Sequence, residues 1–230
     1  ADSLKIAQID TLIVGKSKSG YENIQITGSA NSVSSGLKAD DTFKDAWLQF
    51  DATAKVFKGY YKIKRNLNKK VKIAIGSDYT FLNQLASFSF SENQASSGIF
   101  RFFGTWNAWR KSENTSGSLV LKIEHRHALW NPMTPRNLGY EAGAALSTAT
   151  FKDVSWGLTN FYWKHLVYDK YFVVAGVMDP GDWIDLYPLL NPFTFYLNEA
   201  FSNSPAMAIP NQGLGVVVGA KRILKQFYVS

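Results

Sequence analysis

Apolar and polar residues alternate along much of the chain from about Trp47 onward. Successive side chains of a β-strand point to opposite faces of a sheet, so this period of two predicts strands with one apolar face. Segments of about ten residues separated by turn-forming clusters are typical of membrane β-barrels. The predicted strands span 46–57, 59–66, 70–80, 98–110, 118–129, 138–148, 156–168, 170–179 and 213–222, and a last strand begins at Gln226.

Short polar segments between these strands predict turns at 66–68, 113–117 and 168–170. The connection at about 179–211 is far longer and holds five of the seven prolines. Connections of this length are usually functional. Short turns on one rim and long connections on the other are the usual asymmetry of outer-membrane barrels.

The composition divides the chain into two parts. Residues 1–42 form a polar segment rich in Ser, Gly, Asn and Lys, and residues 43–230 form the predicted β-barrel domain. No run of about 18 apolar residues occurs, which excludes helical membrane spans. Cysteine is absent, which excludes disulfides and thiolate metal sites.

The net charge of +7 is concentrated in one segment, in which several cations alternate with apolar residues. These cations are Lys55, Lys58, Lys62, Lys64, Arg65, Lys69, Lys70 and Lys72. The alternation predicts a solvated or lumen-facing strand surface. A nucleic-acid interface is the weaker interpretation because no recognition motif accompanies the charge.

The predicted strand 118–129 separates two kinds of side chain. Alternation places Lys122, Glu124 and Arg126 on one face, and the leucines, Ile123, His125 and His127 on the other. Strand 98–110 likewise places Phe100, Phe102, Gly104 and Trp106 on one face and Arg101, Phe103, Thr105 and Asn107 on the other. A charged row is tolerated where it faces a wide polar lumen, whereas a sandwich core would require every charge to be paired.

Five short runs resemble the carbohydrate-selective porin family of Gram-negative outer membranes, in the family's order over roughly residues 95–230. The runs are Phe103-Gly104-Thr105-Trp106, Lys122-Ile123-Glu124-His125-Arg126-His127, Gly157-Leu158-Thr159-Asn160-Phe161-Tyr162-Trp163-Lys164, Ala175-Gly176-Val177-Met178-Asp179-Pro180 and Pro210-Asn211-Gln212-Gly213-Leu214-Gly215. The resemblance implies an antiparallel transmembrane barrel of about sixteen strands. It also implies an inward-folded loop, with charged and aromatic side chains that order sugar hydroxyls.

The chain supplies roughly ten predicted strands, fewer than the family's barrel needs. We expect that roughly the second half of such a barrel is missing from this chain, so that the barrel domain is incomplete at its C-terminal end. The alternative is that ten strands close a smaller barrel, which requires another register.

The candidate pore-lining residues carry charges or amides on the predicted lumen face and on the long connection. They are Arg101, Lys122, Glu124, Arg126, Asp179, Asp182, Asp185, Asn198 and Asn211. The charged row on strand 118–129 either orients solutes or forms a salt-bridge ladder that stiffens the wall. Replacement of both Glu124 and Arg126 by alanine is expected to change solute selectivity more than stability.

Two metal-site interpretations are weaker. The carboxylates of residues 179–185 lack the further ligands of an EF-hand loop. His125 and His127 are spaced for zinc, but only His165 remains as a further histidine ligand.

The sequence therefore predicts a porin of the bacterial outer membrane that lets sugars or other small hydrophilic solutes diffuse passively. No cofactor, metal, catalytic residue or nucleic-acid partner is expected, because nucleophile and phosphate-binding motifs are absent. The expected partners are the solutes and outer-membrane lipid, and a homo-oligomer is one alternative for the assembly. The alternative functions are a lipase-like barrel enzyme in the outer membrane and a soluble ligand-binding barrel. A continuous apolar band about 25 Å tall on the outward face would separate these alternatives from a membrane pore.

Overall fold

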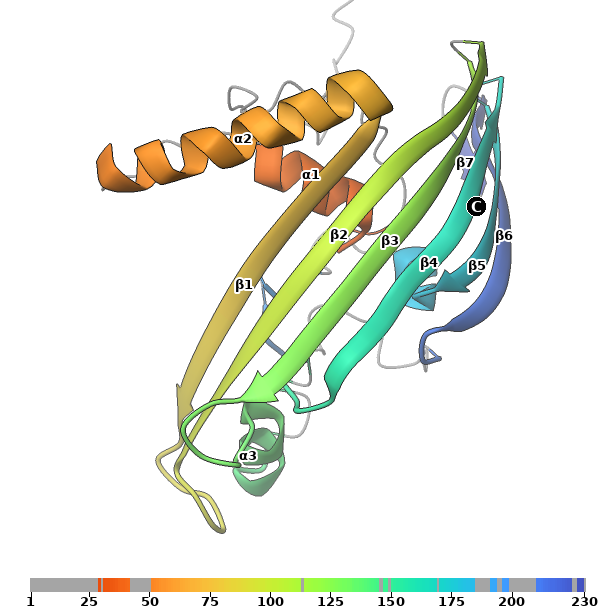
Figure 1. Cartoon of the computed structure of the whole chain (residues 1–230). Coiled ribbons are helices and arrows are strands. Elements are labelled where there is room, and N and C mark those ends of the chain that lie inside the picture. Colours follow the sequence, from red (N-terminus) through yellow and green to blue (C-terminus); the bar gives the residue numbers. More distant parts are fainter. Residues whose placement is uncertain are drawn as a thin grey trace, which may run out of the picture.

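A seven-stranded antiparallel sheet dominates the fold (Figure 1). The computed structural model describes residues 29, 31–41, 51–112, 114–144, 147–148, 150–168, 170–184, 191–193, 196–198, 210–224 and 227–229. The strands are β1 (Ile73–Leu85), β2 (Gln94–Ser112), β3 (Thr115–Ala128), β4 (Ser155–Val167), β5 (Tyr171–Met178), β6 (Gly213–Leu224) and β7 (Phe227–Val229). Each strand pairs with its neighbour in the sequence, so the sheet is a simple meander.

The strand predictions at 70–80, 98–110, 118–129, 156–168, 170–179 and 213–222 are confirmed as β1 to β6, and β7 follows Gln226. The short turns predicted after β2 and after β4 also lie where the strands reverse. The sheet is antiparallel as predicted, but it is open. In the part of the chain that the structure describes, β1 and β7 are its two edges, and it has seven strands rather than ten.

The predictions of strands at 46–57 and 59–66, and of a turn at 66–68, are wrong where the structure describes these residues. The helix α2 (Asp51–Val71) runs through all three. Lys58, Lys62, Arg65 and Lys69 are three or four residues apart, which is the spacing of one helix face, and this period prevails over the local alternation. No helix among the described residues combines the length and hydropathy needed to cross a bilayer.

The strand predicted at 138–148 is also wrong, because the short helix α3 (Pro135–Glu141) begins that segment. Thr134 caps α3 by accepting a hydrogen bond from the backbone N–H of Asn137, and Pro135 occupies the first turn. A capping threonine followed by proline favours a helix start over a strand.

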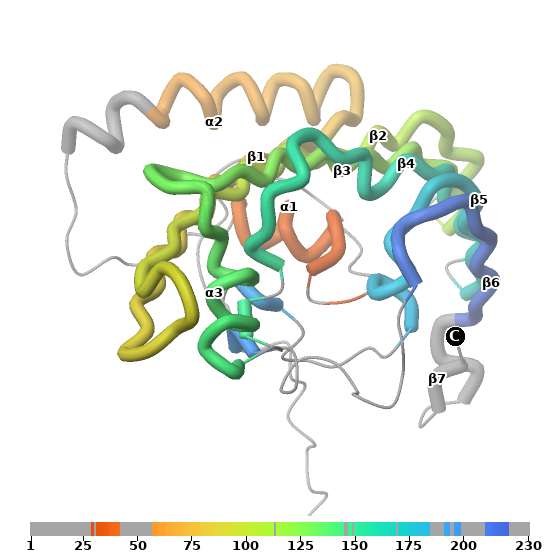
Figure 2. Tube along the Cα trace, turned by 90° about the horizontal axis from the view of Figure 1, so that it is seen from below, coloured from red at the N-terminus to blue at the C-terminus, as the bar shows by residue number. Residues whose placement is uncertain are grey.

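The sheet bends into an arc around the helix α1 (Val33–Asp41), as Figure 2 shows. Val33 and Leu37 are almost fully buried and belong to the apolar core on the concave face. The ring of Phe103 fills the space between the helix and the sheet, because Gly36 of α1 and Gly76 of β1 leave room for it. A Cβ on Gly36 would lie 3.1 Å from this ring. The predicted polar segment 1–42 therefore includes a helix that packs inside the arc.

Candidate functional site

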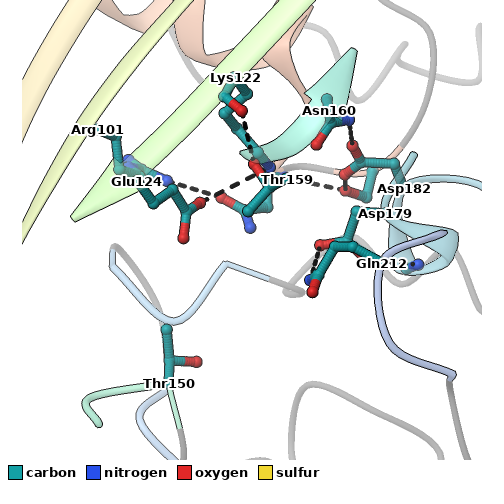
Figure 3. Close-up of polar contacts among 12 residues, drawn as sticks. Arg101, Lys122, Glu124, Thr150, Thr159, Asn160, Asp179, Asp182 and Gln212 are labelled. Carbon is teal, nitrogen blue, oxygen red and sulfur yellow. Dashed lines mark hydrogen bonds and ion pairs between the residues drawn. The ribbon is translucent and has the colours of Figure 1, made fainter. Parts of the chain in front are cut away.

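Charged side chains form a ladder across the concave face of three neighbouring strands. Asp78 of β1 lies opposite Arg101 of β2, and Arg101 lies opposite Glu124 of β3. Lys122 and Arg126 flank Glu124 on the same face of β3, as Figure 3 shows in part. The three cations and two carboxylates leave a net charge of +1. The predicted common face of Lys122, Glu124 and Arg126 is thus confirmed by the register.

The guanidinium of Arg101 is held from two sides. Its Nε and Nη2 donate to the two carboxylate oxygens of Asp78 at 2.8 and 2.7 Å, and its Nη1 donates to Oδ1 of Asn31 at 2.7 Å. The guanidinium carbon lies 3.8 Å from the ring centre of Phe193. The two parallel hydrogen bonds to Asp78 fix both the position and the orientation of the Arg101 guanidinium, because its planar array of N–H groups matches the two oxygens of a carboxylate.

Glu124 is 2% exposed and is paired mainly with Arg126. Nε and Nη2 of Arg126 donate to Oε2 of Glu124 at 2.9 and 2.5 Å, and Nη1 donates to the carbonyl of Thr150 at 3.2 Å. Lys122 lies farther away, with its Nζ 3.9 Å from Oε1 of Glu124. Buried charges are stable only when they are paired, and the arginine provides the direct pairing here.

Two polar atoms beside this ion pair have no hydrogen-bond partner among the described residues. They are Nζ of Lys122 and Oδ1 of Asn160. The two residues lie opposite each other on β3 and β4, and both are at most 2% exposed. One of these atoms is a donor and the other is an acceptor, and the backbones of the two residues are paired.

A bulge in β4 brings Asn160 to this position. Lys122 pairs with Asn160 and Ile123 pairs with Leu158, so Thr159 is the extra residue. The Thr159 hydroxyl donates to the carbonyl of Lys122 at 3.1 Å. Bulges re-aim side chains in this way and are common beside functional sites.

Asp182 connects the long connection to the sheet. It lies in the 3-10 helix η2 (Pro180–Asp182), and its Oδ2 accepts a hydrogen bond from Nδ2 of Asn160 at 2.8 Å. Its Oδ1 accepts from the Ser29 hydroxyl at 2.8 Å. Asp179 caps η2 at the Gly181 N–H and accepts from the Gln212 side chain at 3.0 Å (Figure 3). Both carboxylates thus have structural hydrogen bonds, and they point to separate partners rather than to one calcium ion.

A cavity of about 250 Å³ lies between the helix α1 and the charged ladder. Its polar lining includes Asn31, Asp78, Arg101, Lys122 and Asn191. Two residues of the connection between β5 and β6 reach this region. Asn191 lines the cavity, and the ring of Phe193 packs against the Arg101 guanidinium. The expectation of an inward-folded connection is therefore consistent with these contacts.

Three other candidate residues lie away from the ladder or outside the described part. Asn198 forms an isolated β-bridge with Ser147, and Asn211 is exposed just before β6. Asp185 lies outside the described residues.

Asp78, Asn160 and Phe193 are not among the residues predicted from the sequence. Asp78 is the only charged residue of β1, and a lone carboxylate within an apolar alternation is a signal that could have been used. Asn160 could not have been placed, because its face depends on the bulge at Thr159. Phe193 has no sequence signal, because only the folded connection brings it to Arg101.

The convex face of the same strands is apolar. Within 73–85, 95–106, 117–128, 155–167, 171–178 and 213–220 the charged residues all share the concave face. They are Asp78, Arg101, Lys122, Glu124, Arg126 and Lys164. Large apolar side chains of the convex face are exposed, including Tyr79, Phe81, Trp106, Trp156, Leu158, Phe161, Trp163, Val173, Leu214, Val216 and Val218. An exposed apolar face of this extent is characteristic of an interaction surface.

Three histidines interrupt the convex face. Nε2 of His127 lies 3.0 Å from the Tyr79 hydroxyl oxygen, and Nδ1 of His127 lies 3.1 Å from Nδ1 of His125. His165 stacks on Trp109. The outward orientation that alternation predicts for His125 and His127 is confirmed.

No protein family model matches the chain, and neither the curated proteins nor the solved structures contain a match.

Proposed function

We propose that this chain forms the wall of an outer-membrane porin through which sugars or other small hydrophilic solutes diffuse passively. The observation that carries this proposal is the separation of charge between the two faces of β1 to β6. Six charged residues lie on the concave face of the strand segments compared above, and the convex face presents exposed aromatic and branched aliphatic side chains. Transmembrane barrel strands have this distribution, with an apolar face toward lipid and a polar face toward the lumen.

The convex face favours the membrane pore over a soluble ligand-binding barrel. Leu214, Val216 and Val218 are each at least 67% exposed, and all three lie on one strand. A water-facing strand would carry polar residues at these positions, because antiparallel sheets facing water alternate apolar-in and polar-out. Acyl chains would cover these side chains without a hydration cost.

The rims of the sheet agree with a barrel in the outer membrane. The turns from β2 to β3 and from β4 to β5 are short, whereas the connections from β3 to β4 and from β5 to β6 are long. Bacterial outer-membrane barrels have short periplasmic turns and long extracellular loops.

The charged ladder would set the selectivity of the pore. Asp78, Arg101, Glu124 and Arg126 form ion pairs that hold one another in place. Lys122 lines the cavity, and its Nζ has no hydrogen-bond partner among the described residues. Fixed charges and paired hydrogen-bonding groups in a narrow pore order the hydroxyls of a passing sugar.

The proposal is tested by single-channel conductance of the folded protein in a planar bilayer, with neutral sugars added in turn. Discrete open steps that sugars partly block are expected. Parallel swelling of vesicles that contain the protein would show the passage of the sugars themselves. Protein that is shown to be inserted, yet neither conducts nor passes sugars, would contradict the proposal and favour the lipase-like barrel enzyme.

A matched pair of variants connects the conductance to the ladder. Lys122→Gln changes the charge at the cavity, whereas Lys152→Gln makes the same substitution outside the ladder, in the connection from β3 to β4. We expect the first to change sugar block and the second to leave it unchanged. Equal effects of the two variants on sugar block would show that the ladder does not line the path of the sugar.

A further inference from the structure

The helix α2 lies at one rim of the sheet, on its convex side, and crosses the direction of the strands (Figures 1 and 2). It ends at Val71, and the Asn107 N–H of β2 donates to the carbonyl of Lys72 at 3.0 Å. This is the rim at which the short turns from β2 to β3 and from β4 to β5 lie. By the usual asymmetry of outer-membrane barrels, it is the periplasmic rim.

The side chains of α2 form two opposed faces. Four lysines of α2 are exposed, and they are Lys58, Lys62, Lys69 and Lys70. Lys70 lies at the border of the two faces, seven residues after Ile63, and Lys58, Lys62 and Lys69 share one side of the helix at helical spacing. The opposite side carries Tyr60, Ile63, Leu67 and Val71, also three or four residues apart. Ile63 is 60% exposed, although it belongs to the apolar side. A helix with these two faces is typical of a membrane interface.

Lys64 fixes α2 to the rest of the fold. This lysine is fully buried and pairs with Asp40 of α1, and its Nζ lies 5.0 Å from the ring centre of Tyr60. The ion pair between Lys64 and Asp40 lies on the side of α2 that faces α1. It leaves Ile63 and the four lysines outside the protein interior.

The exposed Val71 at the end of α2 leads directly into a strand with apolar residues on the convex face of the sheet. β1 begins at Ile73, two residues after the helix ends, and Ile73 and Ile75 lie on the convex face. A partner that covers both α2 and the convex face must therefore be apolar where it contacts the convex face. It must be anionic where it contacts the lysines of α2. A bilayer surface with anionic headgroups has both properties in the required order.

We propose that α2 is an interfacial anchor that lies on the periplasm-facing leaflet of the membrane. Its lysines bind anionic phospholipid headgroups, and the exposed Ile63 and Val71 enter the boundary of the acyl chains. This inference rests on the proposed membrane pore. It adds a lipid-binding surface that the pore itself does not require.

The absence of cysteine makes a direct test possible, because any introduced cysteine is the only labelling site in the chain. Three single variants are labelled with an environment-sensitive fluorophore and placed in vesicles that contain acyl-chain nitroxides. Ile63→Cys reports on the apolar side of α2, Asn66→Cys on its exposed polar side, and Val216→Cys on the convex face of β6. The vesicles contain phosphatidylethanolamine with or without phosphatidylglycerol.

Quenching of the Val216 and Ile63 labels, with the Asn66 label open to an aqueous quencher, is the expected result. Phosphatidylglycerol should increase Ile63 quenching by about twofold or more, because each lysine near an anionic surface adds attraction. The variant Lys58→Gln/Lys62→Gln/Lys69→Gln/Lys70→Gln should lose this increase. The control variant Arg136→Gln/Lys152→Gln, which changes cations outside α2, should keep it.

The two proposals fail in different ways. A Val216 label that stays open to water would overturn the membrane pore and the anchor together. A quenched Val216 label with a water-exposed Ile63 label in both lipid mixtures would overturn the anchor alone, and it would assign α2 to a protein partner. An Ile63 label that is quenched without any response to phosphatidylglycerol would overturn the role of the lysines.

Discussion

The concave and convex faces of the sheet belong to the same strands but differ in charge: the concave face combines charged residues with the apolar core, and the convex face is apolar. On β3, Lys122, Glu124 and Arg126 point to the concave face, whereas Leu121 and Ile123, the two neighbours of Lys122, point to the convex face. The concave face accepts charge because Asp78 and Glu124 provide partners there. The convex face of the compared strand segments has no acid, lysine or arginine. Neighbouring residues of a strand differ mainly in the face to which they point. A difference in charge between them therefore indicates that the two faces have different surroundings.

The strongest test of the concave face is the removal of its central carboxylate. Glu124→Ala leaves Arg126 and Lys122 without their common partner, and we expect a loss of about 3 to 5 kcal/mol in the free energy of unfolding. Urea titration of the folded protein measures it. The double variant Glu124→Ala/Arg126→Ala should lose less, because it does not leave Arg126 unpaired. A single variant as stable as the wild type would mean that the pair faces water.

A charge on the convex face tests the other side of the comparison. Val216→Arg should destabilise the protein by about 2 to 4 kcal/mol in lipid vesicles, because an arginine within the acyl chains is costly. In a sheet that faces water, the same exposed position would tolerate arginine within about 0.5 kcal/mol. Unfolding titrations in vesicles separate the two results, and Val216→Leu is the control for size.

The geometry of the concave ladder is tested by a substitution that keeps its charge. Arg101→Lys retains the cation but cannot donate in parallel to both oxygens of Asp78 and also to Asn31. We expect a loss of about 1.5 to 3 kcal/mol, the contribution of hydrogen bonds to charged groups. Equal stability of the two proteins would show that only the charge at position 101 matters.

The smallest expected effect on stability is at Lys122. Lys122→Gln should change the free energy of unfolding by less than about 1 kcal/mol, because Glu124 keeps both hydrogen bonds from Arg126. The ladder's net charge falls from +1 to zero, so the reversal potential in a salt gradient should shift toward cation preference. A stable variant with unchanged ion preference would place Lys122 outside the solute path.

The expectation that replacing both Glu124 and Arg126 changes selectivity more than stability is sharpened by the ion-pair geometry. Both side chains are fixed by hydrogen bonds to each other, and Arg126 also donates to Thr150. Their joint removal leaves Lys122, which lines the cavity together with Asp78 and Arg101, without its neighbouring carboxylate. Selectivity and stability measured on the same double variant decide between a pore-lining and a stiffening role.

The sequence by itself determined the local features that depend on a single strand. Alternation separated Lys122 from Leu121 correctly, because the two-residue period of a strand needs no tertiary contact. It failed at 51–71, where short alternations among lysines concealed a helical period that extends over the whole segment. The prediction of a strand at 138–148 is wrong because the Thr134 cap and Pro135 start a helix that extends to Glu141.

Only the tertiary structure decided which distant residues meet. The bulge at Thr159 shifts the register of β4 by one residue and thereby turns Asn160 toward Lys122, and a shift of one residue reverses every later side chain. The packing of α1 inside the arc and the approach of Phe193 to Arg101 join segments that are far apart in the chain. Such contacts depend on how the sheet bends and on how the connections return to it, and neither is encoded in a local pattern of residues.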